Sequence, residues 1–412
     1  MFLFLKPSIA IGSIVLALMV SMTAIGFNSA ISLVSHKSNL TSTNSSTTTT
    51  TMTTTMSVGT HVFNATQSSS NSSIATQENE TITKYSNQTT NWSKLLSSES
   101  RGQLCDSNMA NMISKLRIAV VKPVFTASAY QWNGFYNAYN TLGSSKTTNE
   151  EKLAALKDFQ VRLSNSWGFS GAMANFVSSN AAKQCGLVLG KNVQIITDVD
   201  IANGTLFYPN NGSARFDVVT LVFDEYVTSS EYDALYHFVS SGGSLILMDS
   251  CNFVAEVRYN QTSNIVTFVK GHGWEFNGSA AWSLNYFERW SANNTNWVGS
   301  TFCCFKRLAY RGAQLSNSSN FITKGMKNLF GNQTIFTDYA SHEENSVTNM
   351  TNTSIIASFI QTKPSNLLVA SYIHLYKRGV VIHIGFMSDD IFGSDSATQD
   401  FYILSLFYTS TR

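Results

Sequence analysis

The chain has 412 residues, 13% of them charged, and a formal net charge of +2. A balance so close to neutral gives no basic surface for a polyanion, so we expect no nucleic-acid partner. With few charges, the polar surface must come from Asn, Ser, Thr and Tyr, a composition that suits a glycosylated cell-surface protein better than a cytosolic one.

The first predicted element is an apolar segment near the N-terminus. Residues 8–34 contain no Asp, Glu, Lys or Arg, and such a run can cross the roughly 30 Å hydrocarbon core of a bilayer. It is either a transmembrane helix behind a short cytoplasmic segment, residues 1–7, or a signal peptide with a cleavage site at Ala24 or Ala30. The run continues past both alanines, which favours the helix. The membrane is therefore an expected partner.

Residues 35–102 are dominated by Ser, Thr, Asn and Gln. Such a segment cannot bury enough apolar surface to offset its ordering entropy, and we expect a disordered stalk. Asn-x-Ser/Thr sequons begin here and continue to the end of the chain. The candidate glycosylation sites are Asn39, Asn44, Asn64, Asn71, Asn79, Asn87, Asn91, Asn203, Asn211, Asn260, Asn277, Asn293, Asn317, Asn332, Asn349 and Asn352. Their density beside a membrane segment predicts that the C-terminal side is extracellular, in a single-pass protein of the cell membrane, with envelope glycans or proteins as partners.

Residues 103–412 have the apolar periodicity of one globular domain. The predicted strands lie at 118–121, 193–196, 218–223, 245–248, 367–373 and 380–384. The predicted helices lie at 128–142, 150–167, 171–185, 228–241 and 396–408. Thr228 and Glu231 form a capping box at the start of the helix after strand 218–223, so 216–251 is a β-α-β crossover between parallel strands. We expect an α/β fold with a doubly wound, mostly parallel sheet and an irregular Trp- and Asn-rich insertion at 271–352.

The cysteines are odd in number, and none has the Cys-x-x-Cys spacing of a zinc or redox site. They are Cys105, Cys185, Cys251, Cys303 and Cys304. An extracellular compartment permits disulfides, but the pairing cannot be read from the sequence. We expect buried thiols and one bridge.

Ligands of open parallel sheets bind beyond the carboxyl ends of the strands, so the residues that follow the strands are the candidates for a site. These are residues 126–130, 224–226, 249–252, His272 and 388–390. Carboxylates with His and Tyr nearby could bind a metal or act as acid and base, while the alternative is ordinary capping and packing. Cys251 has the place of a nucleophile after a central strand, yet its neighbours Ser250 and Asn252 lack the small size that a strained elbow needs.

Tryptophans are frequent in the predicted insertion. They are Trp274, Trp282, Trp290 and Trp297. Such side chains could form an aromatic platform for sugars or peptides, but a role in the core beneath the insertion is the more common one.

Three fragments carry a family resemblance: Ala-Tyr-Gln-Trp-Asn-Gly-Phe-Tyr at 129–136, Asp-Glu-Tyr at 224–226, and Asn252 followed by Glu-Val-Arg at 256–258. Together they resemble the C-terminal domain of the large subunit of N,N-dimethylformamidase and its archaeal relatives. The resemblance implies a class I glutamine-amidotransferase-like, flavodoxin-like fold and an iron-dependent amidohydrolase whose metal is held by two tyrosines and a glutamate. An archaeal envelope would also suit the scarcity of charge and the many Asn, Ser and Thr residues.

Carried over by position, Tyr130 matches the tyrosine of the family's Ala-Tyr-Asn fragment and Glu225 the glutamate of its His-Asp-Glu-Tyr-Trp fragment. The family's second tyrosine would lie before the strand of the glutamate, but no Tyr occurs between Tyr139 and Tyr208. Phe223 stands where the family has His. The resemblance therefore supplies two metal ligands, Tyr130 and Glu225.

Three functional hypotheses follow. The first is a catalytically altered family member that acts in surface binding or envelope organisation. The second is a metal-dependent hydrolase of C–N bonds in small amides or peptides, classed with the enzymes of C–N bonds other than peptide bonds. It would hold iron or zinc on Tyr130 and Glu225, with Asn252, His272 or Glu275 beside them. The third is a hydrolase centred on Cys251.

Overall fold

The computed structural model describes residues 105–166, 170–249, 251–274, 288–304, 310–331, 344–347, 349–361, 369–385 and 396–412. All of these belong to the compact unit formed by residues 71–412. The expected membrane segment at 8–34 and the stalk at 35–102 lie outside the described residues. Among the helices that the structure does describe, none is both long and apolar enough to span a bilayer.

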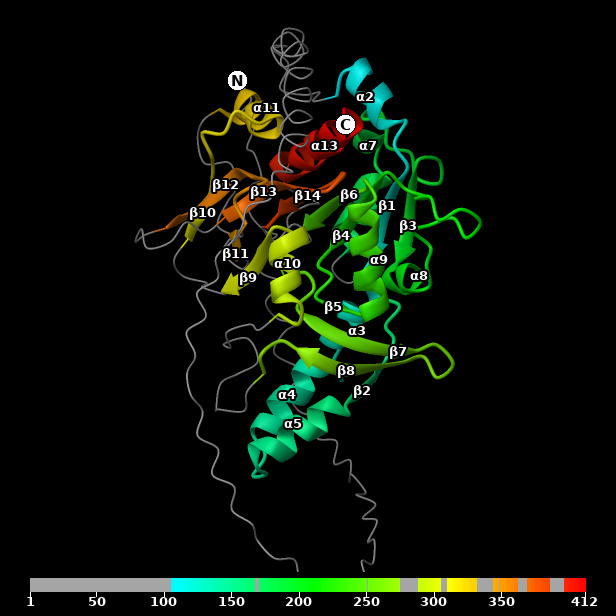
Figure 1. Cartoon of the computed structure of the whole chain (residues 1–412), viewed down its shortest axis with the longest axis vertical. Helices are drawn as coiled ribbons and strands as arrows, with labels where there is room; N and C mark the ends of the chain where they lie inside the picture. Colours follow the sequence, from blue (N-terminus) through cyan, green and yellow to red (C-terminus); the bar gives the residue numbers. More distant parts are fainter. Residues whose placement is uncertain are drawn as a thin grey trace, which may run out of the picture. The chain divides into compact units, whose positions relative to one another are not determined.

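The core of the domain is a mixed β-sheet (Figure 1). Its parallel part consists, in spatial order, of β3 (Val193–Thr197), β1 (Ile118–Lys122), β4 (Val218–Val222), β6 (Ser244–Met248) and β14 (Gly379–Ile384). Antiparallel strands continue from β14 through β13 (Val369–Tyr376) and β12 (Thr353–Gln361) to β10 (Tyr310–Leu315). β11 (Glu344–Val347) pairs with β13 and with β9 (Ser300–Cys304). The α/β class and a mostly parallel eight-strand path are confirmed, within a mixed sheet.

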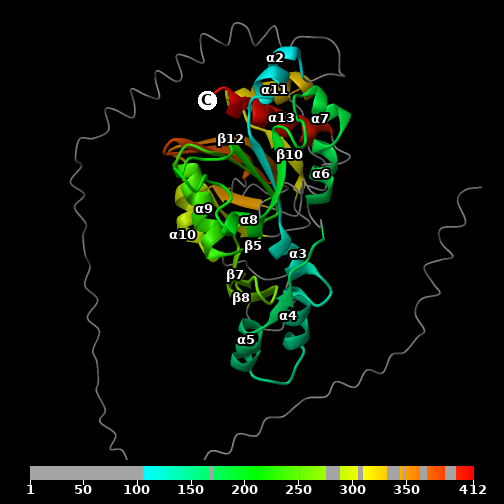
Figure 2. The same ribbon diagram turned by 90° about the vertical axis from the view of Figure 1, so that its right-hand side faces the viewer.

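Helices cover both faces of this sheet, because the central strands are apolar on both sides. Along β1, Ile118 and Val120 belong to one core and Ala119 and Val121 to the other. The first core lies under α2 (Ser107–Ile113), α6 (Gly171–Val177), α7 (Asn180–Gln184), α11 (Phe321–Phe330) and α13 (Ser396–Ser410). The second lies under α8 (Asp198–Ala202), α9 (Ser229–Ser240) and α10 (Ser291–Trp297). Figure 2 shows α9 and α10 on one side and α6 and α7 on the other.

The predicted capping box begins α9. The Glu231 amide donates to the Thr228 hydroxyl at 3.2 Å, and the Thr228 amide donates to the Glu231 carboxylate at 3.4 Å. These reciprocal bonds satisfy two backbone donors that have no partner within the helix.

A second, four-stranded sheet lies beyond the carboxyl ends of the parallel strands and was not expected from the sequence. It consists of β2 (Gln160–Arg162), β8 (Ile265–Gly271), β7 (Ala255–Asn260) and β5 (Tyr226–Val227). With α3 (Val124–Tyr130), α4 (Phe135–Gly143) and α5 (Asn149–Lys157) it encloses a separate aromatic core. In Figure 1 this lobe forms the lower end of the described domain.

Three predicted helices are wrong in extent. The helix expected at 128–142 is two helices, α3 and α4, because the backbone becomes extended at Gln131. The turn between them needs glycine at 134, where a Cβ would lie 1.9 Å from the Ala129 carbonyl oxygen. The helix expected at 150–167 ends at Lys157, and β2 follows, paired with β8. The helix expected at 171–185 is divided into α6 and α7, where Ser179 caps the second helix.

The segment 271–352 is not wholly irregular, because its described parts contain α10, β9, β10, α11 and β11. Trp274, Trp290 and Trp297 are buried, which confirms their core role. Glu275 and Trp282 lie outside the described residues.

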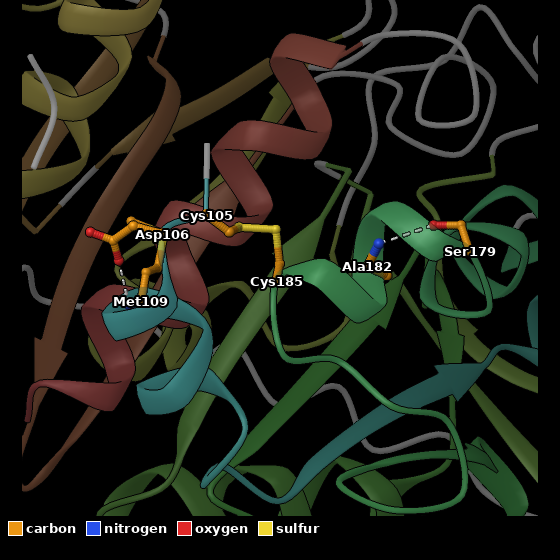
Figure 3. Close-up of a disulfide and its surroundings, with 6 residues drawn as sticks. All are labelled: Cys105, Asp106, Met109, Ser179, Ala182 and Cys185. Atoms are coloured by element: carbon orange, nitrogen blue, oxygen red, sulfur yellow. Dashed lines mark hydrogen bonds between the residues drawn. A yellow bond between two sulfur atoms is a disulfide. The ribbon is translucent and has the colours of Figure 1, made fainter. Parts of the chain in front are cut away.

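One disulfide, between Cys105 and Cys185, ties the start of α2 to the end of α7 (Figure 3). Both helices begin with a side-chain cap beside it: Asp106 accepts from the Met109 amide at 2.7 Å and Ser179 from the Ala182 amide at 3.1 Å. An expected bridge is thus present among the described residues, and Cys251 is buried.

Candidate functional site

Four polar side chains from four chain segments meet beyond the carboxyl ends of the parallel strands. They are Tyr130 at the end of α3, Tyr136 in the first turn of α4, Glu225 after β4, and His272 after β8. The Tyr130 hydroxyl donates to the Tyr136 hydroxyl at 2.9 Å, and the Tyr136 hydroxyl donates to Glu225 Oε1 at 2.6 Å. His272 Nε2 lies 2.5 Å from Glu225 Oε1 and 2.7 Å from Tyr136 Oη. We call these four residues the Tyr-Glu-His cluster.

The cluster is almost fully removed from solvent. Glu225 and His272 are 0% exposed and Tyr136 is 3% exposed, whereas Tyr130 is half-buried. Among the described residues, Glu225 Oε2 accepts no hydrogen bond. The cluster therefore contains a buried carboxylate, that of Glu225, in which one oxygen accepts no hydrogen bond and is open to a ligand. Tyr130 is the member that reaches the surface.

Four expected site residues belong to the cluster or support it. Tyr130, Glu225 and His272 are brought together as members. Asn252 lies outside the cluster: its Oδ1 accepts from the Asp224 amide at 3.0 Å, and its Nδ2 donates to the Asp249 carbonyl at 2.5 Å. Asn252 therefore connects the loops after β4 and β6 and holds Glu225 in place through its chain neighbour.

Tyr136 was missed from the sequence. Within one continuous helix, two residues six positions apart point about 120° away from each other, so Tyr130 and Tyr136 would not meet. The break at Gly134 turns α4 back toward α3, and the two rings pack with their centroids 4.4 Å apart. A second phenol oxygen thus lies beside that of Tyr130, from a residue only six positions further along the chain.

The backbone around the cluster is strained. Phe223, Asp249, Phe253 and His272 all have positive φ, at 62°, 81°, 61° and 69°. Left-handed residues other than glycine cost on the order of 1–3 kcal/mol each and gather at functional sites. All four lie in the loops at the carboxyl ends of β4, β6 and β8, so the strain is concentrated at this edge.

The chain reversal after β8 places His272. Gly271 has φ of 113°, and a Cβ there would lie 2.4 Å from the Val254 carbonyl oxygen. The imidazole of His272 then stacks on the Tyr226 ring at 5.6 Å and contacts the Trp274 ring at 4.4 Å. These aromatic neighbours fix the ring so that Nε2 faces Glu225 and Tyr136.

Cys251 packs in an apolar group with Phe223, Val254 and Phe302, next to the Tyr130 ring. Such surroundings are typical of an inert structural thiol rather than of an activated nucleophile.

Two further groups of buried acids lie near the cluster. Burial first, and then mutual repulsion, raises the pKa values of Asp224 and Glu231, while burial is the main cause of the raised pKa of Asp198. Glu288, whose pKa burial raises to about 8, accepts from the Phe302 amide at 2.5 Å and from the Asn294 side chain at 3.0 Å.

Glu288 also lines a cavity of about 10 Å³, room for about one water molecule. The other lining residues are Leu247, Asn252, Phe253, Asn294, Val298, Ser300 and His383. Burial lowers the pKa of His383 to about 3, so this imidazole is neutral.

Residues 35–388 match the family described as N,N-dimethylformamidase beta subunit-like, C-terminal. The chain belongs to this family. The match begins directly after the predicted membrane segment. No curated protein matches the sequence.

Solved structures show a distant likeness. A ThuA-like protein from Bacteroides uniformis is 12% identical, over 58% of this chain and 82% of that chain, with a TM-score of 0.33. A cytoplasmic protein from Salmonella typhimurium is 10% identical, over 61% and 96%, with a TM-score of 0.34. A β-galactosidase from Bacillus circulans is 9% identical, over 72% of this chain but only 30% of its own, with a TM-score of 0.31. These similarities carry no inference about activity.

The family resemblance implies a metal, and the donor set of the cluster fits one. No group of three or more His, Cys, Asp or Glu side chains within the described ranges is placed to hold a metal ion. The cluster instead offers two phenol oxygens, a carboxylate with one open oxygen, and an imidazole nitrogen. Imidazole nitrogen suits iron and zinc, and carboxylate oxygen suits hard cations.

Proposed function

We propose that this chain is a metal-dependent hydrolase of C–N bonds in amides, held at the outer face of a membrane by its N-terminal segment. The observation that carries the proposal is the convergence of Tyr130, Tyr136, Glu225 and His272 within hydrogen-bonding distance in a buried place. It brings together two tyrosines and a glutamate, the residue types that the family resemblance implies for the metal, although Tyr136 does not stand where the resemblance would place the second tyrosine. The fold would then be of the class I glutamine-amidotransferase-like type.

In this proposal Tyr130, Tyr136 and Glu225 hold the metal, iron in preference to zinc. When bound, the metal would polarise the amide carbonyl as a Lewis acid. His272 Nε2 faces Glu225 Oε1 and Tyr136 Oη and can hold a proton shared with either group. Burial of these atoms keeps bulk solvent out, so that charges within the cluster act on one another strongly.

An extracytoplasmic location has two supports. The Cys105–Cys185 disulfide is the kind of bond that persists in oxidising compartments. Of the described sequon asparagines, Asn203, Asn211, Asn260, Asn293, Asn317 and Asn352 are exposed and Asn349 is half-buried, so all reach the surface. The sites at Asn39, Asn44, Asn64, Asn71, Asn79, Asn87, Asn91, Asn277 and Asn332 lie outside the described residues. The membrane, and envelope glycans or proteins, stay as the proposed partners.

The test is metal analysis of the full chain, purified in detergent without chelator. We expect about one metal ion per chain, lost in Glu225→Ala and in Tyr136→Phe. The matched control is Glu150→Ala, an exposed glutamate at the start of α5, which should keep the metal. Metal binding would justify a screen of amide substrates. A wild-type chain that binds no metal would refute the hydrolase.

One observation favours a second function, binding at the cell surface without catalysis. Phe223, where the family has a histidine, packs edge-on against the Tyr130 ring at 5.7 Å. A phenyl ring transfers no proton, so the site is altered beside its most exposed member. Metal binding without hydrolysis of any amide in the screen would support this second function.

A further inference from the structure

The turn between α3 and α4 presents an unusually exposed tryptophan. Trp132 is 85% exposed, more than any other large hydrophobic side chain in the described ranges. The tryptophans Trp274, Trp290 and Trp297 are each 8% exposed or less. Burial of large aromatic rings is a main source of stability, so an indole held in solvent calls for a partner.

The turn that carries Trp132 is rigid. The Gly134 amide donates to the Gln131 carbonyl at 2.7 Å, and the Gln131 side chain donates to the Arg162 carbonyl at 3.0 Å. The Asn137 side chain donates to the carbonyl of Trp132 itself. Three hydrogen bonds thus hold the backbone of the turn that carries Trp132, so this residue is exposed on a backbone of defined conformation. A backbone held in this way loses little entropy when a ligand binds.

The same turn joins two members of the Tyr-Glu-His cluster. Tyr130 directly precedes it, and Tyr136 follows it by two residues. Tyr130 is also the one member of the cluster that reaches solvent. A substrate that approaches the cluster past Tyr130 therefore arrives beside the turn.

The stretch of chain that carries this turn contains no sequon. None occurs between Asn91 and Asn203, the stretch that contains the turn. Met350, in contrast, is 54% exposed but lies between the sequons at Asn349 and Asn352, where a glycan would shield it. Trp132 therefore has no sequon on its own segment of the chain.

We infer that Trp132 is a substrate-binding residue of this site and that its substrates are amides that carry an aromatic ring. The inference rests on the proposed function. Aromatic pairs prefer offset-stacked or edge-to-face contacts and gain affinity beyond the area they bury. An aromatic amide can stack on the indole while its C–N bond lies at the cluster, whereas a small aliphatic amide leaves the indole uncovered.

The test compares two probe amides, acetanilide and N-methylacetamide, on the metal-loaded full chain. For acetanilide we expect Trp132→Ala to raise KM about ten-fold with kcat changed less than about two-fold, and Trp132→Phe to lie between, because a stacking contact contributes about this factor. For N-methylacetamide neither variant should change KM. The matched control is Leu153→Ala, which removes an exposed apolar side chain from α5 and should change nothing. Equal effects on both amides, or no effect on acetanilide, would overturn the inference.

Calorimetric binding of acetanilide to the Glu225→Ala variant separates this inference from the proposed function. Binding that weakens about ten-fold when Trp132→Ala is added supports the role of Trp132, even if no amide is hydrolysed by the wild-type chain. Hydrolysis of both amides without any dependence on Trp132 would support the hydrolase and refute the role of Trp132.

Discussion

Replacement of Glu288 by glutamine should flatten the pH dependence of stability. Glu288 is 4% exposed, and burial raises its pKa from 4.5 to about 8 although two donors contact the carboxylate. Between these two values the folded chain keeps a proton that the unfolded chain has released. The free energy of unfolding therefore falls as pH rises, by about 1.4 kcal/mol per pH unit, and the full contribution of Glu288 is present only below pH 4.5.

Summed over this window, the contribution of Glu288 amounts to roughly 5 kcal/mol. The Glu288→Gln variant has no proton to lose, so its unfolding free energy should decline less steeply by up to about 1.4 kcal/mol per unit. Its absolute stability at low pH should be lower than that of the wild type, because the new amide donor faces the amide donor of Asn294. The change in slope is therefore the informative quantity.

The assay is urea unfolding at pH 5, 6, 7 and 8 for the wild type, Glu288→Gln and the exposed control Glu150→Gln. The control should follow the wild type at every pH. Wild-type and Glu288→Gln curves that run parallel from pH 5 to pH 8 would refute the reasoning, since Glu288 would then be ionised in the folded chain.

The remaining predictions concern the turn and the disulfide. Gly134→Ala forces a Cβ against the Ala129 carbonyl oxygen, so we expect a loss of more than about 2 kcal/mol in urea unfolding together with loss of the bound metal. Unchanged metal content would show that the turn does not set the distance between the two tyrosines. Cys105→Ser opens a loop with a sequence separation of 80 and should cost about 4 kcal/mol, read as a lower Tm. Added reductant should lower the Tm of the wild type but leave that of the variant unchanged.

The central strands and the capped helix were predictable because their determinants are local. β4 and β6 are runs of five residues that are buried throughout, and the capping box needs only Thr228 and Glu231. The residues of each of these elements are enough to predict it, and the structure places β4, β6 and α9 within a residue or two of the expected ranges.

The four-stranded sheet could not be predicted, because its strands owe their existence to their partners. β5 has two residues and β2 three, too few for any alternation of polar and apolar positions to show. β2 exists because β8 pairs with it, and this pairing brings together residues about a hundred positions apart.

Which residues belong to the Tyr-Glu-His cluster depends on the turn at Gly134 and on the long-range contact between His272 and Glu225. Glycine is tolerated within a helical pattern, so Gly134 does not by itself indicate a turn, and only the folded chain shows that no Cβ fits there beside the Ala129 carbonyl oxygen. Without that turn, Tyr136 would point away from Tyr130. His272 meets Glu225 although 47 residues separate them, and no local pattern marks this pairing.

The disulfide also has a mechanical consequence for a chain anchored at its N-terminus as proposed. A pulling force along the anchor enters the described domain at Cys105 and passes through the covalent bond directly to Cys185. The residues between the two cysteines, Tyr130 and Tyr136 among them, then carry no tension. The disulfide would thus carry the force in place of these residues, so that a stretched tether leaves the distance between the two tyrosines unchanged.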